Sequence, residues 1–266
     1  MTTDIKQVEL KSVSASKLRL YLQCPRHYYY AYGEGIFQEE TPATRFGSYI
    51  HAVIEDYSKS LIAGGLGQDM EKLYSAANAR KKEFSEIPET GDLSFFEADV
   101  FLNRFASRTI KPGNIYAVEK AFDIPFYDDG KVRLTGRIDR MDIVSEKDTK
   151  TLHIIDYKTG RNEISGENLK KDIQMKFYVY GAFLLYKKHH RNIRFTLSYL
   201  RDGNEVSFET SEPDIFGAEI ENLIRRLASD KSYPKKTGPL CRYCPAFKLC
   251  KPEIRPAENS AGLLHE

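Results

Sequence analysis

The sequence predicts an α/β protein built around an antiparallel meander of three strands. Runs rich in β-branched residues, bounded by turn residues, occupy positions 115–126, 132–144 and 152–158, and such runs are typical of strands. Short turns at 127–130 and 145–150 separate them, so consecutive strands are expected to pair antiparallel. Amphipathic stretches before and after the meander indicate helices that pack against it.

The composition is that of a soluble globular protein, with 41% hydrophobic and 29% charged residues among 266. No apolar stretch is long enough for a membrane helix, and the first residues lack the apolar core of a signal peptide. We therefore expect a cytoplasmic protein without a membrane partner. The net charge of +2 does not indicate nucleic acid, but positions 225–255 carry nine Lys or Arg against two acidic residues. This basic segment faces either solvent or phosphate.

The N-terminal third is predicted to be mainly helical. Positions 1–12 are polar and are expected to be loose, and Ser14 or Ser16 can cap the first helix. That helix should break at Cys24 because Pro25 follows it. The run of three tyrosines that comes next is expected to pack in the core rather than to stack on bases. After a loop at 33–43, further helices are predicted at 46–62, 68–85 and 92–109.

After the meander, the pattern predicts a helix, a hairpin and a second helix. These elements are a helix at 168–186, strands at 195–200 and 206–210, and a helix at 214–229. The basic run at 187–191 follows the first helix, where the helix dipole favours cations. We expect one domain over 1–266, composed of a helical part at 13–110, a core at 114–230, a cysteine segment at 231–251 and a frayed tail at 252–266.

The last two meander strands carry the residues best suited to chemistry. Asp156 and Lys158 are two positions apart, so both project from one face of a strand while Tyr157 points the other way. Asp139 on the neighbouring strand can supply a second carboxylate. Two carboxylates and a lysine suit a hard divalent cation and an activated water. The alternative is an ordinary ion pair of Asp156 and Lys158 at the sheet edge, with Asp139 as a turn residue or paired with Arg137 or Arg140.

Two predicted helices each carry a polar pair at i and i+4. His51 and Glu55 share one helix face, and Gln174 and Tyr178 share another. His51 lies in a strongly apolar stretch, where a histidine is either a hydrogen-bonded core residue or a metal ligand. A further carboxylate, Glu119, lies inside the first meander strand.

The four cysteines flank the predicted core, with Cys24 near its start and Cys241, Cys244 and Cys250 near its end. Without a signal peptide, structural disulfides are not expected. Four thiolates can hold zinc tetrahedrally or bind a cubane iron–sulfur cluster. The one-plus-three split and the two Cys-Pro pairs favour an iron–sulfur cluster, with zinc or free thiols as alternatives. A metal centre here would link two distant segments, and closing such a loop stabilises a fold by roughly 5 kcal/mol.

Taken in order, these motifs resemble those of the PD-(D/E)XK nuclease superfamily. The set is His51, Glu119, Asp139, Asp156-Tyr157-Lys158, and Gln174 with Tyr178, bracketed by the cysteines. Within the superfamily, the chain is similar to RecB-like nucleases that carry a four-cysteine cluster. These include AddB nuclease domains, phage exonucleases and CRISPR-adaptation nucleases. The resemblance extends from Ser14 to Cys250, and Ile138 stands where the name of the superfamily has proline.

The resemblance implies a restriction-endonuclease-like core, in which helices flank a central mixed β-sheet. It further implies that N- and C-terminal segments are joined by a four-cysteine [4Fe–4S] cluster. The metal ligands that it implies, around Mg²⁺ or Mn²⁺, are His51, Asp139, Asp156 and the carbonyl of Tyr157. Lys158 would orient the attacking water or stabilise charge at phosphorus, Gln174 and Tyr178 would lie beside the site, and Glu119 would belong to its outer shell. An imidazole ligand favours Mn²⁺ over Mg²⁺.

These implications make a metal-dependent DNA nuclease the leading hypothesis. Its simplest form is an exodeoxyribonuclease that acts on single strands or duplex ends in recombination, repair, or phage or CRISPR DNA processing. The alternative is a DNA-binding or assembly subunit of a helicase–nuclease or recombination complex, with little activity alone. A zinc-linked structural protein is the third interpretation, and it leaves the acidic residues unexplained.

Overall fold

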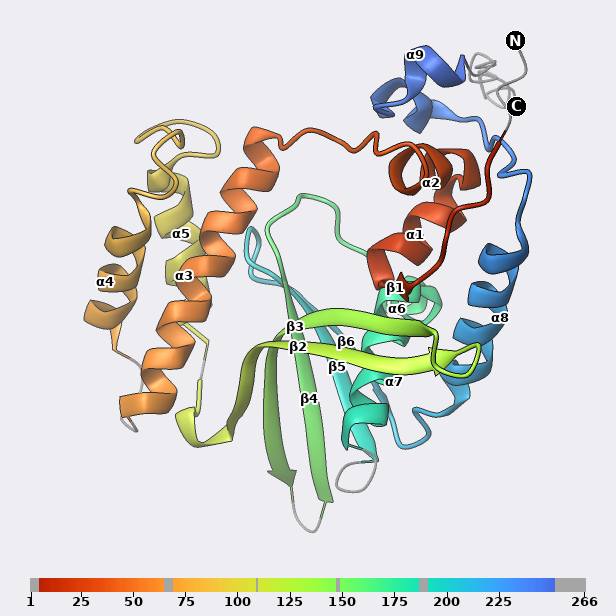
Figure 1. The fold of residues 1–266 in the computed structure, drawn as a ribbon. Coiled ribbons are helices and arrows are strands. Elements are labelled where there is room, and N and C mark those ends of the chain that lie inside the picture. The colour runs from red at the N-terminus through yellow and green to blue at the C-terminus, as the bar shows by residue number, and fades with distance from the viewer. Residues whose placement is uncertain (1–4, 65–68, 109, 147–148, 187–190, 252–266) are drawn as a thin grey trace, which may run out of the picture.

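A mixed β-sheet forms the centre of the fold (Figure 1). The computed structural model describes residues 5–64, 69–108, 110–146, 149–186 and 191–251. Within these residues the sheet has six strands: β1 (Ser12–Val13), β2 (Ile115–Tyr127), β3 (Val132–Glu146), β4 (Thr149–Lys158), β5 (Asn192–Tyr199) and β6 (Glu205–Thr210). They lie in the order β1-β3-β4-β5-β6, and β2 also pairs with β3.

The predicted meander is confirmed. β2 pairs with β3, and β3 with β4, in antiparallel register, with Lys120 opposite Ile138 and Arg140 opposite Ile155. The predicted hairpin of β5 and β6 is also present. β4 and β5 run parallel, so the sheet is mixed, as the resemblance implies. A parallel neighbour requires a crossover connection, and helices form that crossover here.

Helices cover both faces of the sheet (Figure 1). One face packs against α3 (Pro42–Gly64), α4 (Met70–Arg80) and α5 (Phe95–Ala106). The other packs against α1 (Ala15–Gln23), α2 (Pro25–Tyr32), α6 (Gly166–Lys171), α7 (Ile173–Tyr186) and α8 (Ile215–Ser229). A 3-10 helix, η1 (Pro112–Asn114), precedes β2, and the last described segment holds a second 3-10 helix, η2 (Pro239–Tyr243), and the short α9 (Phe247–Cys250).

Each face of the sheet has its own apolar core, and β4 contributes to both. Ile154 lies in the core under α1, α7 and α8, whereas Tyr157 lies in the core under α3 and α5. Phe122 of β2 holds α7 against the sheet, because its ring fills the space beside two glycines. A Cβ atom would lie 2.5 Å from this ring at Gly136 and 3.0 Å from it at Gly181. The close approach fixes the position of α7.

The predicted helix at 168–186 is wrong in one respect, because it is divided into α6 and α7 at Asp172. The backbone of Asp172 is extended, with φ −70° and ψ 123°, and its carboxylate accepts the N–H of Met175 at 2.9 Å. An aspartate that caps in this way begins a new helix. The continuous apolar sequence around it conceals the break.

Other predicted boundaries also need correction. The helices predicted at 68–85 and 92–109 are the shorter α4 and α5, which begin at side-chain caps from Asp69 and Ser94. The expected looseness of 1–12 is wrong for its described part. Ser12 belongs to β1, which pairs parallel with β3, and Gln7 donates to the carbonyl of Ala228 at 2.6 Å. Parts of the predictions lie outside the described residues: positions 1–4, 68, 109, 147–148, the basic run at 187–190 and the tail at 252–266.

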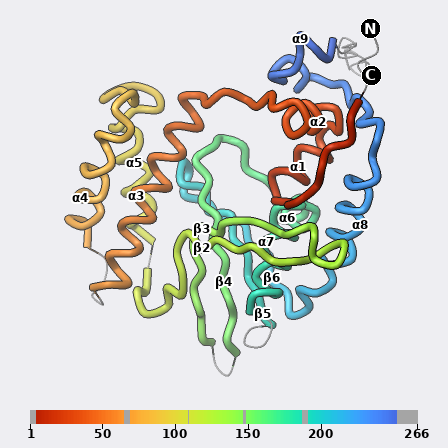
Figure 2. Tube along the Cα trace, viewed as in Figure 1, coloured from red at the N-terminus to blue at the C-terminus, as the bar shows by residue number. Residues whose placement is uncertain are grey.

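The first and last described segments lie side by side (Figure 2). Tyr233, which follows α8, is fully buried and contacts the rings of Tyr28 and Tyr29. Its hydroxyl accepts the N–H of Val8 at 3.0 Å, and its carbonyl accepts the Arg26 guanidinium at 2.7 Å. Two of the three tyrosines predicted to be core residues are therefore buried and hold the C-terminal segment.

Candidate active site

His51 of α3 contacts two residues of the sheet. Its Nε2 atom lies 3.1 Å from the carbonyl oxygen of Tyr157, and its Nδ1 atom lies 3.5 Å from Oδ2 of Asp139. The N–H of Tyr157 donates to the same Asp139 oxygen at 2.9 Å. With its proton on Nε2, the imidazole donates a hydrogen bond to this carbonyl. With its proton on Nδ1, facing Asp139, the Nε2 lone pair could instead bind a cation together with the carbonyl oxygen.

Glu119 of β2 has a left-handed backbone conformation, with φ of 47°, inside a strand whose residues on both sides remain paired with β3. For a residue other than glycine, this conformation costs about 1–3 kcal/mol and is concentrated at functional sites. Burial, followed by the charge of Asp139, raises the pKa of Glu119 to about 7. The chain therefore holds a carboxylate in an unfavourable conformation beside a second carboxylate.

The ligand atoms of His51, Glu119 and Asp139 all lie within 4.8 Å of one another. Throughout the described ranges, no other group of three His, Cys, Asp or Glu side chains comes this close together. These three residues and the Tyr157 carbonyl offer one imidazole nitrogen and several oxygens, a donor set that fits a divalent cation such as Mg²⁺ or Mn²⁺. Glu119, which the resemblance assigns to the outer shell, lies among the donors.

Asp156 lies outside this group and is held by two neighbours. Lys158 Nζ lies 2.5 Å from its Oδ2 atom, and Gln174 Nε2 donates to its Oδ1 atom at 3.1 Å. Lys158 also donates to Gln174 Oε1 at 3.4 Å, so the three side chains form a closed ring of contacts. Burial raises the pKa of Asp156, and the adjacent Lys158 ammonium opposes this rise. The charges of Asp139 and His51 also act on Asp156, so the two sets of residues are neighbours.

α7 places Gln174 and Tyr178 on the same side of the site. Both line a groove together with Lys158, which is consistent with their predicted i and i+4 positions on one helix face. Burial raises the pKa of Tyr178, and the nearby Asp156 carboxylate adds to the rise. The phenol therefore stays protonated, and it can act as a hydrogen-bond donor toward an anion.

The ring of Tyr157 extends away from the site into the core under α3 and α5, where it contacts Phe105. On that side, Arg140 and Asp142 of β3 form a buried pair, with two hydrogen bonds of 2.7 and 2.6 Å. Burial raises the pKa of Tyr157, and the neighbouring Arg140 guanidinium opposes the rise. The backbone of Tyr157 that faces His51 is thus held from behind by a buried ion pair.

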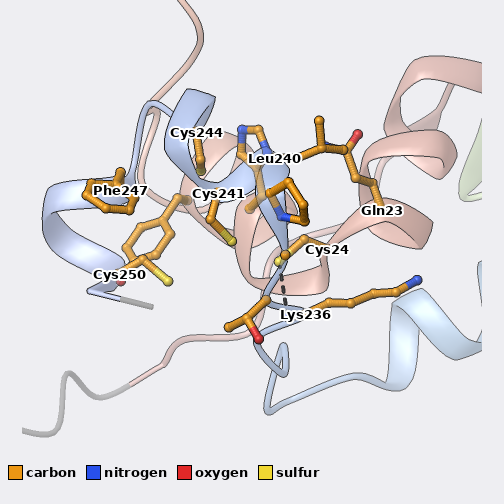
Figure 3. Close-up of a pocket in the computed structure, with 13 residues that line it drawn as sticks. Gln23, Cys24, Lys236, Leu240, Cys241, Cys244, Phe247 and Cys250 are labelled. Carbon is orange, nitrogen blue, oxygen red and sulfur yellow. Dashed lines mark hydrogen bonds between the residues drawn. The ribbon is translucent and has the colours of Figure 1, made fainter. Parts of the chain in front are cut away.

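All four cysteines line one pocket between the end of α1 and the segment of η2 and α9 (Figure 3). Cys24 separates α1 from α2, Cys241 lies in η2, Cys244 follows it and Cys250 ends α9. The N–H of Lys236 donates to Cys24 Sγ at 3.4 Å. Burial raises the pKa of the Cys244 and Cys250 thiols. The fold therefore brings together thiols that are 217 positions apart in the chain.

The sulfur atoms are more widely spaced than in a closed zinc site. In the described part of the chain, no three of these sulfurs lie within 4.8 Å of one another. Tetrahedral zinc, with Zn–S bonds of about 2.3 Å, would require sulfur–sulfur separations of roughly 3.8 Å. All four cysteines are free thiols. The pocket thus contains all four predicted cysteines, but their sulfur atoms would have to move closer together to bind a single zinc ion.

A mixed sheet flanked by helices, with carboxylates and a lysine on adjacent strands, defines the class of restriction-endonuclease-like proteins. The chain belongs to the PD-(D/E)XK nuclease superfamily, whose family model matches residues 12–251. The match covers the sheet, the candidate active site and the four cysteines.

Several curated proteins are similar to this chain. An ATP-dependent helicase/deoxyribonuclease subunit of Clostridioides difficile is 26% identical over 247 residues, which covers 80% of this chain and 21% of that protein. The protein of the same name in Carboxydothermus hydrogenoformans is 27% identical over 200 residues, or 64% of this chain and 18% of that protein. The chain thus spans about a fifth of the length of these relatives. The solved structure of SSO0001 aligns with 93% of this chain and 89% of its own, at 15% identity and a TM-score of 0.39, too weak a likeness to carry an argument.

Two features of the site were not predicted, and only one of them has a signal in the sequence. The left-handed conformation of Glu119 has no sequence signal, because glutamate is not a residue that favours it. The pair of Arg140 and Asp142 did have a signal, since two opposite charges stand two positions apart in an otherwise apolar strand.

None of the described helices is both long and apolar enough to span a membrane.

Proposed function

We propose that this chain is a divalent-metal-dependent deoxyribonuclease that acts as an exonuclease on single-stranded or end-exposed DNA. One observation carries the proposal: in a member of this superfamily, His51, Glu119 and Asp139 converge within 4.8 Å beside the pair of Asp156 and Lys158. Nothing in a purely structural role requires three such donors to be held together, one of them in a strained conformation.

The residues that would hold Mg²⁺ or Mn²⁺ are His51, Glu119, Asp139 and the Tyr157 carbonyl, and Asp156 would join them when Lys158 leaves it for the substrate. A divalent cation at such a site supplies charge neutralisation at the phosphate and lowers the pKa of water. The softer imidazole donor favours Mn²⁺. The cation would also compensate the repulsion between Glu119 and Asp139.

The remaining polar residues would act on the substrate directly. Lys158 is long enough to leave Asp156 and to hydrogen-bond the attacking water or a phosphate oxygen, which are the roles that an ammonium can fill beside an anion. Gln174 contacts both partners of the ion pair, so it would keep Lys158 oriented. Tyr178 would donate its hydroxyl to the DNA backbone from the same groove.

The proposal is tested with end-labelled single-stranded DNA, purified protein and Mn²⁺. The wild type is expected to release short products, while a Lys158→Ala variant leaves the strand intact. A circular single strand serves as the control for exonuclease action, because it has no end. Equal and negligible cleavage by both proteins would refute the proposal, and rapid cleavage of the circle would refute its exonuclease part.

We further propose a [4Fe–4S] cluster in the cysteine pocket, with zinc as the alternative. The support is the convergence of four free thiols, their wide spacing, and the larger size of a cubane cluster compared with one zinc ion. The cluster would join the end of α1 to the C-terminal segment, so its role is structural. Its test is given with the other predictions below.

A second candidate function is suggested by the relatives, whose names describe helicase/deoxyribonuclease subunits. The chain spans about a fifth of their length, so it corresponds to one part of a larger machine. In that case it would bind DNA and assemble with a helicase inside the cell, with little activity alone. Metal-dependent turnover by the isolated chain separates the two proposals.

A further inference from the structure

One face of α1 connects the candidate active site to the cysteine pocket. A groove of about 400 Å³, which we call the α1 groove, lies beside the candidate active site. Its lining includes Ser16, Arg19, Leu20 and Gln23 from α1, and Lys158, Gln174 and Tyr178 from the active site. The spacing of these four residues is that of a single helix face. Gln23 also lines the cysteine pocket, and Figure 3 shows it at the edge of that pocket. The two sites are therefore neighbours along a single helix.

This face of α1 carries one positive charge, that of Arg19. Among the described residues, no carboxylate comes within 4.0 Å of the exposed Arg19 guanidinium, and α1 contains no acidic residue. At the far end of the helix, Lys236 Nζ donates to the carbonyl of Leu22 at 3.0 Å. Arginine side chains without a partner in the fold are suited to phosphate, because their fork of N–H groups matches its oxygens.

The length of the face corresponds to a short stretch of backbone. Ser16 and Gln23 are seven residues apart, or about 10 Å along a helix that rises 1.5 Å per residue. A stacked DNA strand rises about 3.4 Å per nucleotide along its axis, and its neighbouring phosphates, joined through a whole sugar, lie about twice that far apart. The α1 groove therefore has room for one or two phosphates next to the scissile bond.

We propose that the substrate strand leaves the active site along the α1 groove toward the cysteine pocket, and that Arg19 binds its first or second phosphate from the cut. The inference rests on the proposed function, to which it adds the path of the strand. Arg19 is a positioning residue here, because it touches a phosphate that does not react. The cysteine pocket, by holding the end of α1, also fixes the far end of the path.

Binding of a fluorescent single-stranded oligonucleotide tests the path without cleavage. All proteins carry Lys158→Ala so that the strand stays intact, and Arg19→Ala is compared with Arg104→Ala. Arg104 is an exposed arginine near the end of α5 for which no ion pair is present among the described residues. We expect Arg19→Ala to weaken binding roughly tenfold and to reduce the slope of log K against log[salt] by about 0.7, the value for one phosphate on a single strand.

The control should bind like its parent, and Arg19→Lys should restore part of the affinity. Equal binding by Arg19→Ala and Arg104→Ala would overturn the inference. The inference would also be overturned if Arg19→Ala lost affinity with a lowered melting temperature and an unchanged salt slope, because the variant would then be destabilised without losing a phosphate contact. A wild type that binds through Arg19 but never cleaves would contradict the proposed nuclease activity and leave the path intact, so the two failures are distinguishable.

A kinetic experiment locates the path relative to the cut. Oligonucleotides extended by one to six nucleotides beyond the scissile bond are cleaved by protein with Lys158 intact. The kcat/KM of the wild type should rise up to about two added nucleotides and then level off. Arg19→Ala should lose most of that gain through KM, with kcat on long strands little changed. If kcat/KM rose by the same factor with strand length in the wild type and in Arg19→Ala, the proposed path would be contradicted.

Discussion

The imidazole of His51 and the carbonyl of Tyr157 face each other at 3.1 Å, although the two residues are 106 positions apart. The N–H of Tyr157 is bonded to Asp139, and its ring is packed under α3 and α5. A single backbone unit therefore joins α3 to β3 and aligns three potential donors. The geometry of the site depends on how the helical side of the protein packs against the sheet.

His51→Ala is expected to lower the affinity for Mn²⁺ at least about tenfold, because it removes a nitrogen donor from a small set. Isothermal titration with Mn²⁺ measures the change. His51→Gln keeps a polar group of similar length and should recover less than half of the lost free energy of binding. Unchanged affinity in His51→Ala would show that the imidazole does not contact the cation.

Replacing Glu119 separates its charge from its backbone conformation. Glu119→Gly and Glu119→Ala both remove the carboxylate, so both should bind Mn²⁺ more weakly than the wild type. Only glycine adopts φ near +50° without strain, so Glu119→Gly should be more stable to urea than Glu119→Ala by about 1 kcal/mol. Equal stability of the two variants would mean that the strand relaxes in solution.

The buried pair of Arg140 and Asp142 predicts strongly non-additive mutations. Arg140→Leu leaves a buried carboxylate without its partner, which should cost about 3–5 kcal/mol of unfolding free energy. Arg140→Leu combined with Asp142→Leu should cost less than Arg140→Leu alone, because no charge is then stranded. Urea unfolding of the two single variants and the double variant measures this coupling. A double variant as unstable as the sum of both single variants would contradict it.

His153 of β4 predicts a loss of stability in mild acid. Burial lowers the pKa of this histidine, and the charges around it are those of Asp142, Arg194, Glu205 and Arg140. Since its folded-state pKa lies below the unfolded value of about 6.5, the unfolded chain binds more protons at lower pH. Stability is therefore full above about pH 6.5 and falls as the pH decreases toward the folded-state pKa.

The urea midpoint of the wild type, measured at pH 7.5, 6.5 and 5.5, checks this dependence. His153→Gln keeps a hydrogen-bonding group for Thr196, which contacts the imidazole at 2.7 Å. The variant should show a smaller fall in midpoint between pH 7.5 and 5.5. An identical fall in both proteins would assign the effect to other groups.

The cysteine pocket predicts a coloured protein. With a [4Fe–4S] cluster, anaerobically purified protein should be brown and absorb at roughly 400 nm through thiolate-to-iron charge transfer. Cys24→Ser should remove most of the colour and lower the melting temperature, because the link between the two segments is lost. Colourless wild type with one equivalent of zinc would instead support the zinc alternative.

Much of the fold follows from local patterns in the chain. The meander and the hairpin were predicted because β-branched runs and turn residues are local signals. The division of the helix at Asp172 was missed, since its capping bond competes with apolar periodicity that continues on both sides. β1 was missed because two residues are too short for any pattern, and only pairing with β3 makes them a strand.

The candidate site was predicted less completely than the fold. Motif order indicated His51, Asp139, Asp156 and Lys158, whereas the close approach of Glu119 depends on a backbone conformation that no propensity reveals. The ring of contacts around Asp156 likewise depends on the placement of α7 against Phe122. Tertiary packing, rather than sequence spacing, decides which of several carboxylates face one another.

The order in which the pocket thiols occur along the chain has a consequence for biosynthesis. Ribosomes make the N-terminus first. Cys24 is therefore synthesised before every residue of the acidic site. Its three sulfur partners emerge last, at 241, 244 and 250. A nascent or truncated polypeptide can therefore carry all the acidic residues and still be unable to close the pocket. A polypeptide that ends before Cys250 therefore lacks at least one of the four thiols that line the pocket.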